Sequence, residues 1–164
     1  MNSSQIDPVI KFNYQKKIHV DWLDFFNKNK EMLQGIFNKT LIHEIYPKKK
    51  HIFRIFKYLS PNEIKVVILG QDPYINFENI EGDIIPQAEG LSFSVPKRHR
   101  NIPPSLKNIF KELENCYPEF KYKNGNLKKW VKREKIFLLN SALTVIPGKS
   151  NSHQKFWQEF TDKV

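Results

Sequence analysis

The ten residues Lys65-Val66-Val67-Ile68-Leu69-Gly70-Gln71-Asp72-Pro73-Tyr74 decide the fold of this 164-residue chain. Residues 65–69 form a short, continuous run rich in β-branched side chains and closed by a glycine, a pattern typical of a strand buried on both faces of a parallel sheet. A second run of this kind is Ile136-Phe137-Leu138-Leu139. Because about 65 residues separate the two runs, the connection between them has room for helices.

Apolar residues at helical spacing predict five amphipathic helices around these strands. The expected helices cover residues 20–37, 50–59, 105–116 and 127–135, and a last one starts at Ser152. Asp21 or Asp24 lies in the first turn of the first helix, and Ser105 is expected to cap the third. This alternation predicts an α/β fold, a three-layer sandwich with a central, mostly parallel sheet flanked by helices. A chain of this length is expected to form a single domain, residues 1–164.

The chain is strongly basic, with 27 Lys and Arg against 17 Asp and Glu and a net charge of +10. Polyanions are therefore the natural class of partner. The alternative is a Lys-, Asn- and Ile-rich codon bias that leaves only a solvated basic surface, and charge alone does not decide between the two.

Several classes of site are excluded by their missing motifs. The two nearest glycines, Gly82 and Gly90, are eight residues apart, so neither a dinucleotide-binding turn nor a phosphate-binding glycine loop is present. Residues 43–47 fail the HExxH zinc pattern at its last position, and no serine lies in a GxSxG elbow. The one cysteine, Cys116, forms no internal disulfide and no four-cysteine metal site. We expect neither a cofactor nor a metal.

The location of the protein is predicted from what the chain lacks. No stretch approaches 18 consecutive apolar residues, and residues 1–7 lack the basic start and apolar run of a secretory signal. We expect a soluble, intracellular protein that is not secreted and has no membrane partner.

Polar residues follow both predicted strands. The first strand runs into Gln71-Asp72-Pro73-Tyr74 and the second into Asn140-Ser141. Ligands of open parallel sheets bind beyond the carboxyl ends of the strands, so these residues are candidates for a binding site. The alternatives are an Asx turn at Asp72 and a helix cap or a satisfied turn amide at Asn140.

Four ordered signatures, between about Lys50 and Val164, make the chain resemble the family-1 uracil-DNA glycosylases. They are KVVILGQDPY at residues 65–74, AEGLSFSV at 88–95, PPSL at 103–106 and LLNSALTV at 138–145. Ser152-His153, Trp157 and residues 160–164 continue the likeness. The resemblance implies the fold of that family and an enzyme of base-excision repair, a hydrolase that releases uracil from DNA by cleaving the N-glycosidic bond of a flipped-out deoxyuridine.

The resemblance also implies roles for single residues. Asp72 matches the catalytic aspartate, which orients the attacking water and stabilises the positive sugar. Gln71, Tyr74, Phe93 and Asn140 match the uracil-binding residues. Asn140 pairs with uracil O4 and N3–H, Tyr74 excludes the methyl group of thymine, Phe93 stacks on the base, and Gln71 shapes the pocket through its backbone.

Pro103, Pro104 and Ser105 match the loop that grips a DNA phosphate, helped by the amides at the start of the following helix. Other partners implied by the resemblance are uracil-containing DNA, single- or double-stranded, and a proteinaceous glycosylase inhibitor. The protein is expected to act as a monomer without metal or cofactor. His153 is expected to be structural.

The chain departs from the family pattern in three places near the site. Ile75 stands where a histidine normally follows the tyrosine, and Glu89 stands where histidine is common. The loop from Asn76 to Gln87 is longer than in the family and carries the acids Glu78, Glu81 and Asp83. We expect each change to weaken the site without removing its main members.

The larger departure concerns the family loop resembling HPSPLS, which supplies a catalytic histidine and a leucine wedge and has no counterpart here. We therefore expect a glycosylase domain incomplete at its C-terminus, with an unpaired sheet edge and weak or absent catalysis. The alternative is a truncated homologue that acts as a non-catalytic DNA-binding or replication-associated module. A third reading is a basic α/β domain for another anionic ligand.

Overall fold

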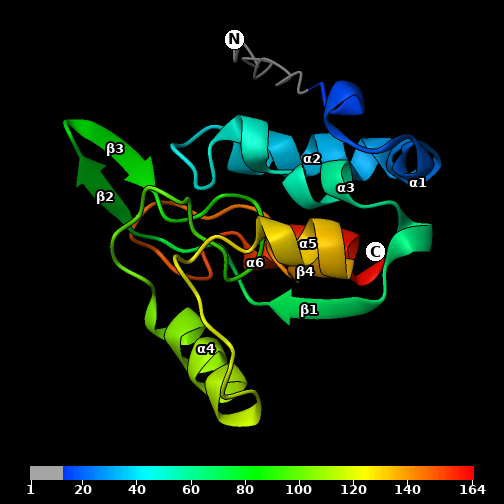
Figure 1. The fold of residues 1–164 in the computed structure, drawn as a ribbon. Helices are drawn as coiled ribbons and strands as arrows, with labels where there is room; N and C mark the ends of the chain where they lie inside the picture. Colours follow the sequence, from blue (N-terminus) through cyan, green and yellow to red (C-terminus); the bar gives the residue numbers. More distant parts are fainter. Residues whose placement is uncertain (1–12) are drawn as a thin grey trace, which may run out of the picture.

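The computed structural model describes residues 13–164 (Figure 1). Its α-helices are α1 (Leu23–Lys28), α2 (Lys30–Thr40), α3 (Arg54–Tyr58), α4 (Pro104–Cys116), α5 (Lys128–Glu134) and α6 (Gln154–Asp162). Its strands are β1 (Val66–Gly70), β2 (Phe77–Ile80), β3 (Asp83–Pro86) and β4 (Ile136–Asn140). Short 3₁₀ turns cover Gln15–Lys17, Val20–Trp22, Lys49–His51 and Pro61–Glu63. Residues 1–7, where no signal pattern was found, lie outside the described residues.

The predicted pair of parallel strands is confirmed. β1 pairs with β4 in parallel, from Val66 opposite Ile136 to Gly70 opposite Asn140. The chain between them forms the β2–β3 hairpin, α4 and α5, with helices packed against the sheet, as expected of an α/β fold (Figure 1). Because the strands are parallel and in register, the two polar segments that follow them start side by side.

The core lies between β4 and the helices. The largest fully buried side chains are aromatic and include Phe26, Phe56, Phe137 and Trp157. Their rings meet mostly edge to face; Phe26 and Phe56, for example, have centroids 5.1 Å apart at 81°. Such pairs add about 0.5–1.5 kcal/mol each beyond the burial of their area. This cluster makes β4 and the helices around it the rigid part of the scaffold.

The prediction that residues 65–69 are buried on both faces was wrong. Val66, Val67 and Leu69 are 50%, 57% and 61% exposed. Among the described residues β1 has a single strand partner, β4. The helices α3 and α5 pack against β4, which leaves the far edge and much of both faces of β1 open. The apolar run identified the strand correctly and misjudged only its burial.

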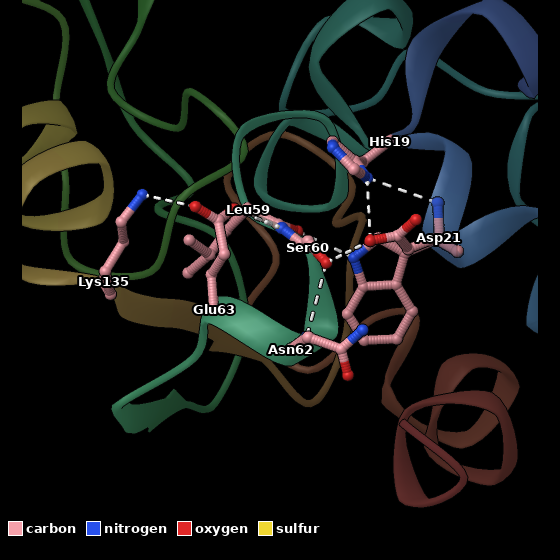
Figure 2. A network of polar contacts seen from close by, with 8 residues as sticks. His19, Asp21, Leu59, Ser60, Asn62, Glu63 and Lys135 are labelled. Carbon is pink, nitrogen blue, oxygen red and sulfur yellow. Dashed lines mark hydrogen bonds and ion pairs between the residues drawn. The ribbon is translucent and has the colours of Figure 1, made fainter.

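A polar network fixes the amino ends of both strands (Figure 2). Ser60 donates to Asp21 at 2.5 Å, and Glu63 accepts from the Ser60 amide and from Lys135 Nζ at 2.7 Å. Lys135 directly precedes β4, and its carbonyl accepts from the amide of Lys65 at 3.0 Å. The network therefore supports the strand register that brings the carboxyl ends of β1 and β4 together.

The helices differ from the sequence predictions at their boundaries. The helix expected over 20–37 is a 3₁₀ turn followed by α1 and α2. The helical conformation is interrupted at Asn29, whose φ of −104° and ψ of 17° are not helical. The Asn29 side chain donates to the carbonyl of Phe25 at 2.8 Å, a local bond that competes with the helix ladder. Residues 50–59 likewise contain a 3₁₀ turn and the short α3.

The segment expected to be a loop between Asn76 and Gln87 contains the antiparallel hairpin β2–β3. Its two-residue turn is Glu81-Gly82, both with positive φ, of 56° and 87°. This backbone suits the right-handed twist of paired strands, and Asn79 accepts from the Gly82 amide at 3.0 Å. The Gly82 turn was the signal that sequence reasoning overlooked. Within residues 13–164, none of the helices is both long and apolar enough to cross a membrane.

Candidate active site

A cavity of about 260 Å³ opens at the carboxyl ends of β1 and β4. Six of the eight predicted site residues line it: Gln71, Asp72, Tyr74, Phe93, Ser105 and Asn140. They come from four segments of the chain. Parallel pairing brings residues 71–74 and Asn140 together, and hydrogen bonds of Ser92 and Ser105 hold the other two segments beside them. Pro103 and Pro104 do not line the cavity.

Asn140 ends β4 directly opposite Gly70. A Cβ atom at position 70 would lie 2.2 Å from the Asn140 side-chain oxygen, so only glycine leaves room for this amide. The described residues provide no hydrogen-bond partner for the amide, which remains free to pair with a ligand. Its position contradicts a role as a helix cap, since it terminates a strand.

Asp72 is held by the loop that precedes α6. Its Oδ2 accepts from the Asn151 amide at 2.7 Å and from Ser150 Oγ at 3.1 Å. Gln71 Nε2 donates to Asn151 Oδ1 at 2.6 Å, which fixes the same loop from the other side. Asn151 has a φ of 60°, a left-handed conformation that asparagine tolerates better than most residues. The sequence analysis missed Ser150 and Asn151, although the polar run before His153 was a signal for them.

Tyr74 connects Phe93, the predicted stacking residue, to the predicted phosphate loop. Its hydroxyl donates to the carbonyl of Phe93 at 3.2 Å and lies 2.9 Å from Ser105 Oγ. Burial raises the pKa of Tyr74, against the opposing effect of the Ser105 bond, so the phenol stays neutral at neutral pH. The ring is thereby fixed at the wall of the cavity.

Phe93 has a φ of 62°, a conformation that costs a bulky residue about 1–3 kcal/mol. The backbone around it is pinned: the Ser92 amide donates to the Leu138 carbonyl at 3.1 Å, and Ser92 Oγ donates to the Ile68 carbonyl. Strain held in place by both strands is typical of functional sites.

Glu89 is buried where the family resemblance favours a histidine. It pairs with Arg54 at 2.6 Å and accepts from Ser94 at 2.5 Å and from Asn126 at 2.6 Å. Burial raises the pKa of Glu89, and the bonds to Ser94 and Arg54 oppose that rise. The carboxylate ties the segment that carries Phe93 to α3 and to the chain before α5. The sequence analysis did not identify this role.

The phosphate-binding prediction rests on the first turn of α4. Pro103 is buried, whereas Pro104 and Ser105 are exposed. The amides of Ser105 and Leu106 lie in that turn, where no intrahelical acceptor exists, so they are available to an anion. Ser105 does not cap the helix as expected. Pro103 occupies the N-cap position, and the Ser105 hydroxyl bonds to Tyr74 instead.

The hairpin acids lie against the basic turn that leads to α4. Glu78 accepts from the amides of Arg100 and Asn101 at 3.0 and 2.9 Å. Arg98 lies 3.4 Å from Glu81 and 3.7 Å from Asp83. These acids are therefore partly neutralised within the chain.

The two residues expected to contribute little to the chemistry are placed accordingly. Ile75 lines the cavity without a polar side-chain atom. His153 is 2% exposed and lies 2.9 Å from Thr144 Oγ1, which also accepts from Trp157. Burial lowers the pKa of His153, which is consistent with a structural role. In the described part of the chain, no three His, Cys, Asp or Glu side chains gather as metal ligands would.

The sequence of this chain is similar to those of named uracil-DNA glycosylases. No family model matches the chain. It is 43% identical over 154 residues to the uracil-DNA glycosylase of Francisella philomiragia, covering 88% of this chain and 66% of that protein. It is 44% identical over 153 residues to the enzyme of Buchnera aphidicola from Acyrthosiphon pisum, covering 88% and 65%. The chain belongs to the uracil-DNA glycosylase family.

Solved structures of this family show the same fold. The crystal structure of mimivirus uracil-DNA glycosylase is 33% identical, with a TM-score of 0.78, and covers 92% of this chain and 56% of that one. A variant of mimivirus UNG was solved in complex with UGI, with the same identity and TM-score. The chain spans less than two thirds of the length of these uracil-DNA glycosylases.

Proposed function

We propose that this chain is a uracil-DNA glycosylase that hydrolyses the N-glycosidic bond of a flipped-out deoxyuridine and releases uracil in base-excision repair. The observation that carries the proposal is the single cavity that Asp72, Tyr74, Phe93 and Asn140 share. A module that only binds DNA has no physical need for this combination of amide, aromatic wall and carboxylate. The single main core of the described residues supports the proposal of one domain. A DNA substrate also implies an intracellular location.

Base recognition follows from the free amide of Asn140. An amide offers one donor and one acceptor, which fit O4 and N3–H of uracil. Cytosine presents the opposite polarity at these atoms, so its binding would leave buried polar groups unpaired. Tyr74 is held by its two hydrogen bonds at the wall of the cavity, which supports its proposed role in excluding the C5 methyl group of thymine.

The chemical step uses Asp72. A water molecule oriented by the carboxylate attacks C1′ of the deoxyribose and gives up a proton, and the bond from C1′ to N1 of uracil breaks. Uracil leaves as an anion with the bonding electrons and is neutralised by that proton. The ionised carboxylate also stabilises the positive charge that develops on the sugar. The donors Asn151 N and Ser150 Oγ both bind Oδ2 and so orient the carboxylate.

DNA binding is proposed to start at the exposed first turn of α4, where Ser105 and the Leu106 amide meet a phosphate. The positive net charge gives salt-sensitive affinity for single- or double-stranded DNA. The mimivirus complex with UGI supports the further proposal that a proteinaceous inhibitor binds this chain, which we expect to be a monomer.

The test is uracil release from a single-stranded oligonucleotide with the protein in excess, followed over hours so that a slow rate is measurable. The 164-residue chain is expected to release uracil slowly, and Asp72→Asn is expected to reduce the rate about 10²–10⁴-fold. Asn140→Ala should also reduce release strongly, and Ser150→Ala should slow it about fivefold, the effect of one hydrogen bond.

The control is Ser3→Ala, which changes a serine that precedes the described residues. No release by the folded chain, together with binding that ignores uracil, would overturn the proposal in favour of a non-catalytic DNA-binding module. Release that persists in both Asp72→Asn and Asn140→Ala would overturn the assigned site.

A further inference from the structure

A second cavity, of about 390 Å³, lies between α4, α5 and the segment that joins them. Its walls combine aromatic rings with lysines, and no acidic residue lines it. The aromatic residues are Phe110, Phe120, Tyr122 and Trp130, and the lysines are Lys97, Lys121, Lys123 and Lys129. The site proposed above uses none of them.

The lysines lack internal partners. Among the described residues, none of the four lies within 4.0 Å of a carboxylate, whereas Lys28, Lys135 and Lys163 each form an ion pair. All four are exposed. Four unpaired positive charges around one cavity attract an anion with several negative charges.

The aromatic rings offer a platform for a planar ligand. Tyr122 stacks on the buried Phe110 with centroids 4.2 Å apart and ring planes at 21°. Trp130 meets the same Phe110 ring edge-on at 6.1 Å. Tyr122 is 41% exposed, so stacking on Phe110 orders its ring while leaving part of it accessible. Nucleobases stack on such rings regardless of sequence.

The two cavities share a wall. Glu89 lines the uracil cavity and Asn126 lines the second one, and their side chains are hydrogen-bonded at 2.6 Å. They also share α4, with Ser105 at the first cavity and Phe110 at the second. Five helical residues rise about 7.5 Å along the helix axis, so the two lining residues of α4 lie within about two turns of each other. The two cavities are therefore neighbours, connected by the Glu89–Asn126 hydrogen bond and by α4.

We infer that the second cavity is a subsite for single-stranded DNA flanking the uracil, in which one base stacks on Tyr122 and the neighbouring phosphates pair with the lysines. The inference rests on the proposed function for its substrate. It adds a contact that requires no uracil, because stacking and phosphate pairing read neither base identity nor damage.

The test measures binding of a fluorescent oligothymidylate, which contains no uracil, by anisotropy over a series of salt concentrations. Tyr122→Ala should weaken binding about 5- to 150-fold, the range for loss of one base–aromatic stack. Tyr122→Phe should retain the affinity. The matched control is Tyr117→Ala, an exposed tyrosine outside the cavity, and it should change affinity less than twofold.

A charge reversal provides an independent arm. Lys121→Glu with Lys123→Glu should lower the slope of log affinity against log salt by about two. The control, Lys16→Glu with Lys30→Glu, makes the same change in net charge in the first 3₁₀ turn and at the first residue of α2, elements that lie away from α4 (Figure 1). This control should change the slope of log affinity against log salt clearly less than Lys121→Glu with Lys123→Glu does.

Equal effects of the cavity variants and their controls would overturn the subsite, as would the absence of any binding to oligothymidylate. The two proposals fail separately. If uracil release does not depend on Asn140 while Tyr122→Ala still weakens binding, the glycosylase proposal is contradicted and the subsite stands. If uracil release depends on Asn140 while Tyr122→Ala leaves binding unchanged, only the subsite is contradicted.

Discussion

At the scale of single residues, the site depends most on the contact between Gly70 and Asn140. A methyl group at position 70 would lie 2.2 Å from the Asn140 oxygen and 3.0 Å from Ser92 Cβ. Gly70→Ala is therefore expected to displace the amide and reduce uracil release about 10- to 100-fold, while circular dichroism shows a folded protein.

The matched control for that variant is Gly35→Ala, in α2. A Cβ there meets nothing within 4 Å. Because alanine is the better helix former, Gly35→Ala should raise the free energy of unfolding by about 0.5–1 kcal/mol and leave uracil release unchanged. Equal activity of the two variants would contradict the assigned role of Gly70.

His51 gives the protein a pH-dependent stability. Burial, with Arg54, Lys50 and Lys48 nearby, lowers its pKa from 6.5 to about 4. Between these pH values the unfolded chain binds more protons than the folded one, so stability falls as the pH falls from 6.5 to 4. His153, whose pKa burial also lowers, acts in the same direction.

We predict that His51→Asn removes part of this loss, on the order of 1 kcal/mol after screening by solvent. The measurement is urea unfolding of the wild type and of His51→Asn at pH 6.5 and 4.5. A pH dependence that is identical in wild type and His51→Asn would be evidence against the buried environment of His51.

Sequence alone identified four residues that line the cavity and missed those that hold them. Asp72, Tyr74, Phe93 and Asn140 lie in signatures, and the structure places them around one cavity. Their supports are Ser150, Asn151 and Glu89, which act through backbone amides or contacts between distant segments. No local pattern encodes such contacts, because they depend on the tertiary structure.

At the scale of elements, the β2–β3 hairpin organises the turn that leads into α4. Glu78→Ala would leave the amides of Arg100 and Asn101 without their acceptor. We expect a loss of about 1–2 kcal/mol in stability and at least tenfold faster hydrogen exchange at these two amides.

The control for the hairpin is Glu81→Ala, which removes an exposed ion pair with Arg98. Such pairs contribute about 0–1 kcal/mol, so exchange at Arg100 and Asn101 should stay slow. If both variants accelerate exchange equally, the hydrogen bonds from the Arg100 and Asn101 amides to Glu78 do not order the turn.

Element types were more predictable than their boundaries. Residues 105–116 and 127–135 show the 3.6-residue period, and α4 and α5 lie within one residue of these limits. The break at Asn29 depends on a side-chain bond to Phe25, which the apolar period does not register. The hairpin turn at Glu81-Gly82 was hidden among residues interpreted as a loop.

At the scale of the whole molecule, the two strands of the parallel pair differ in burial. Leu69 in β1 is 61% exposed, and its register partner Leu139 in β4 is 5% exposed. Leu139→Ala should therefore cost about 2–5 kcal/mol, and Leu69→Ala below about 1 kcal/mol. Chemical unfolding of the two variants provides the comparison. Equal costs would show that the open edge of β1 is covered in solution.

The central claim is that Asn140 reads uracil, and the most direct measurement is an NMR titration of the ¹⁵N-labelled chain with free bases. The Asn140 side-chain resonances are assigned by their absence in Asn140→Ala. They are predicted to shift on addition of uracil and to stay in place with thymine and cytosine. Shifts of equal size with all three bases, or none with uracil while the rest of the spectrum shows a folded protein, would contradict the account.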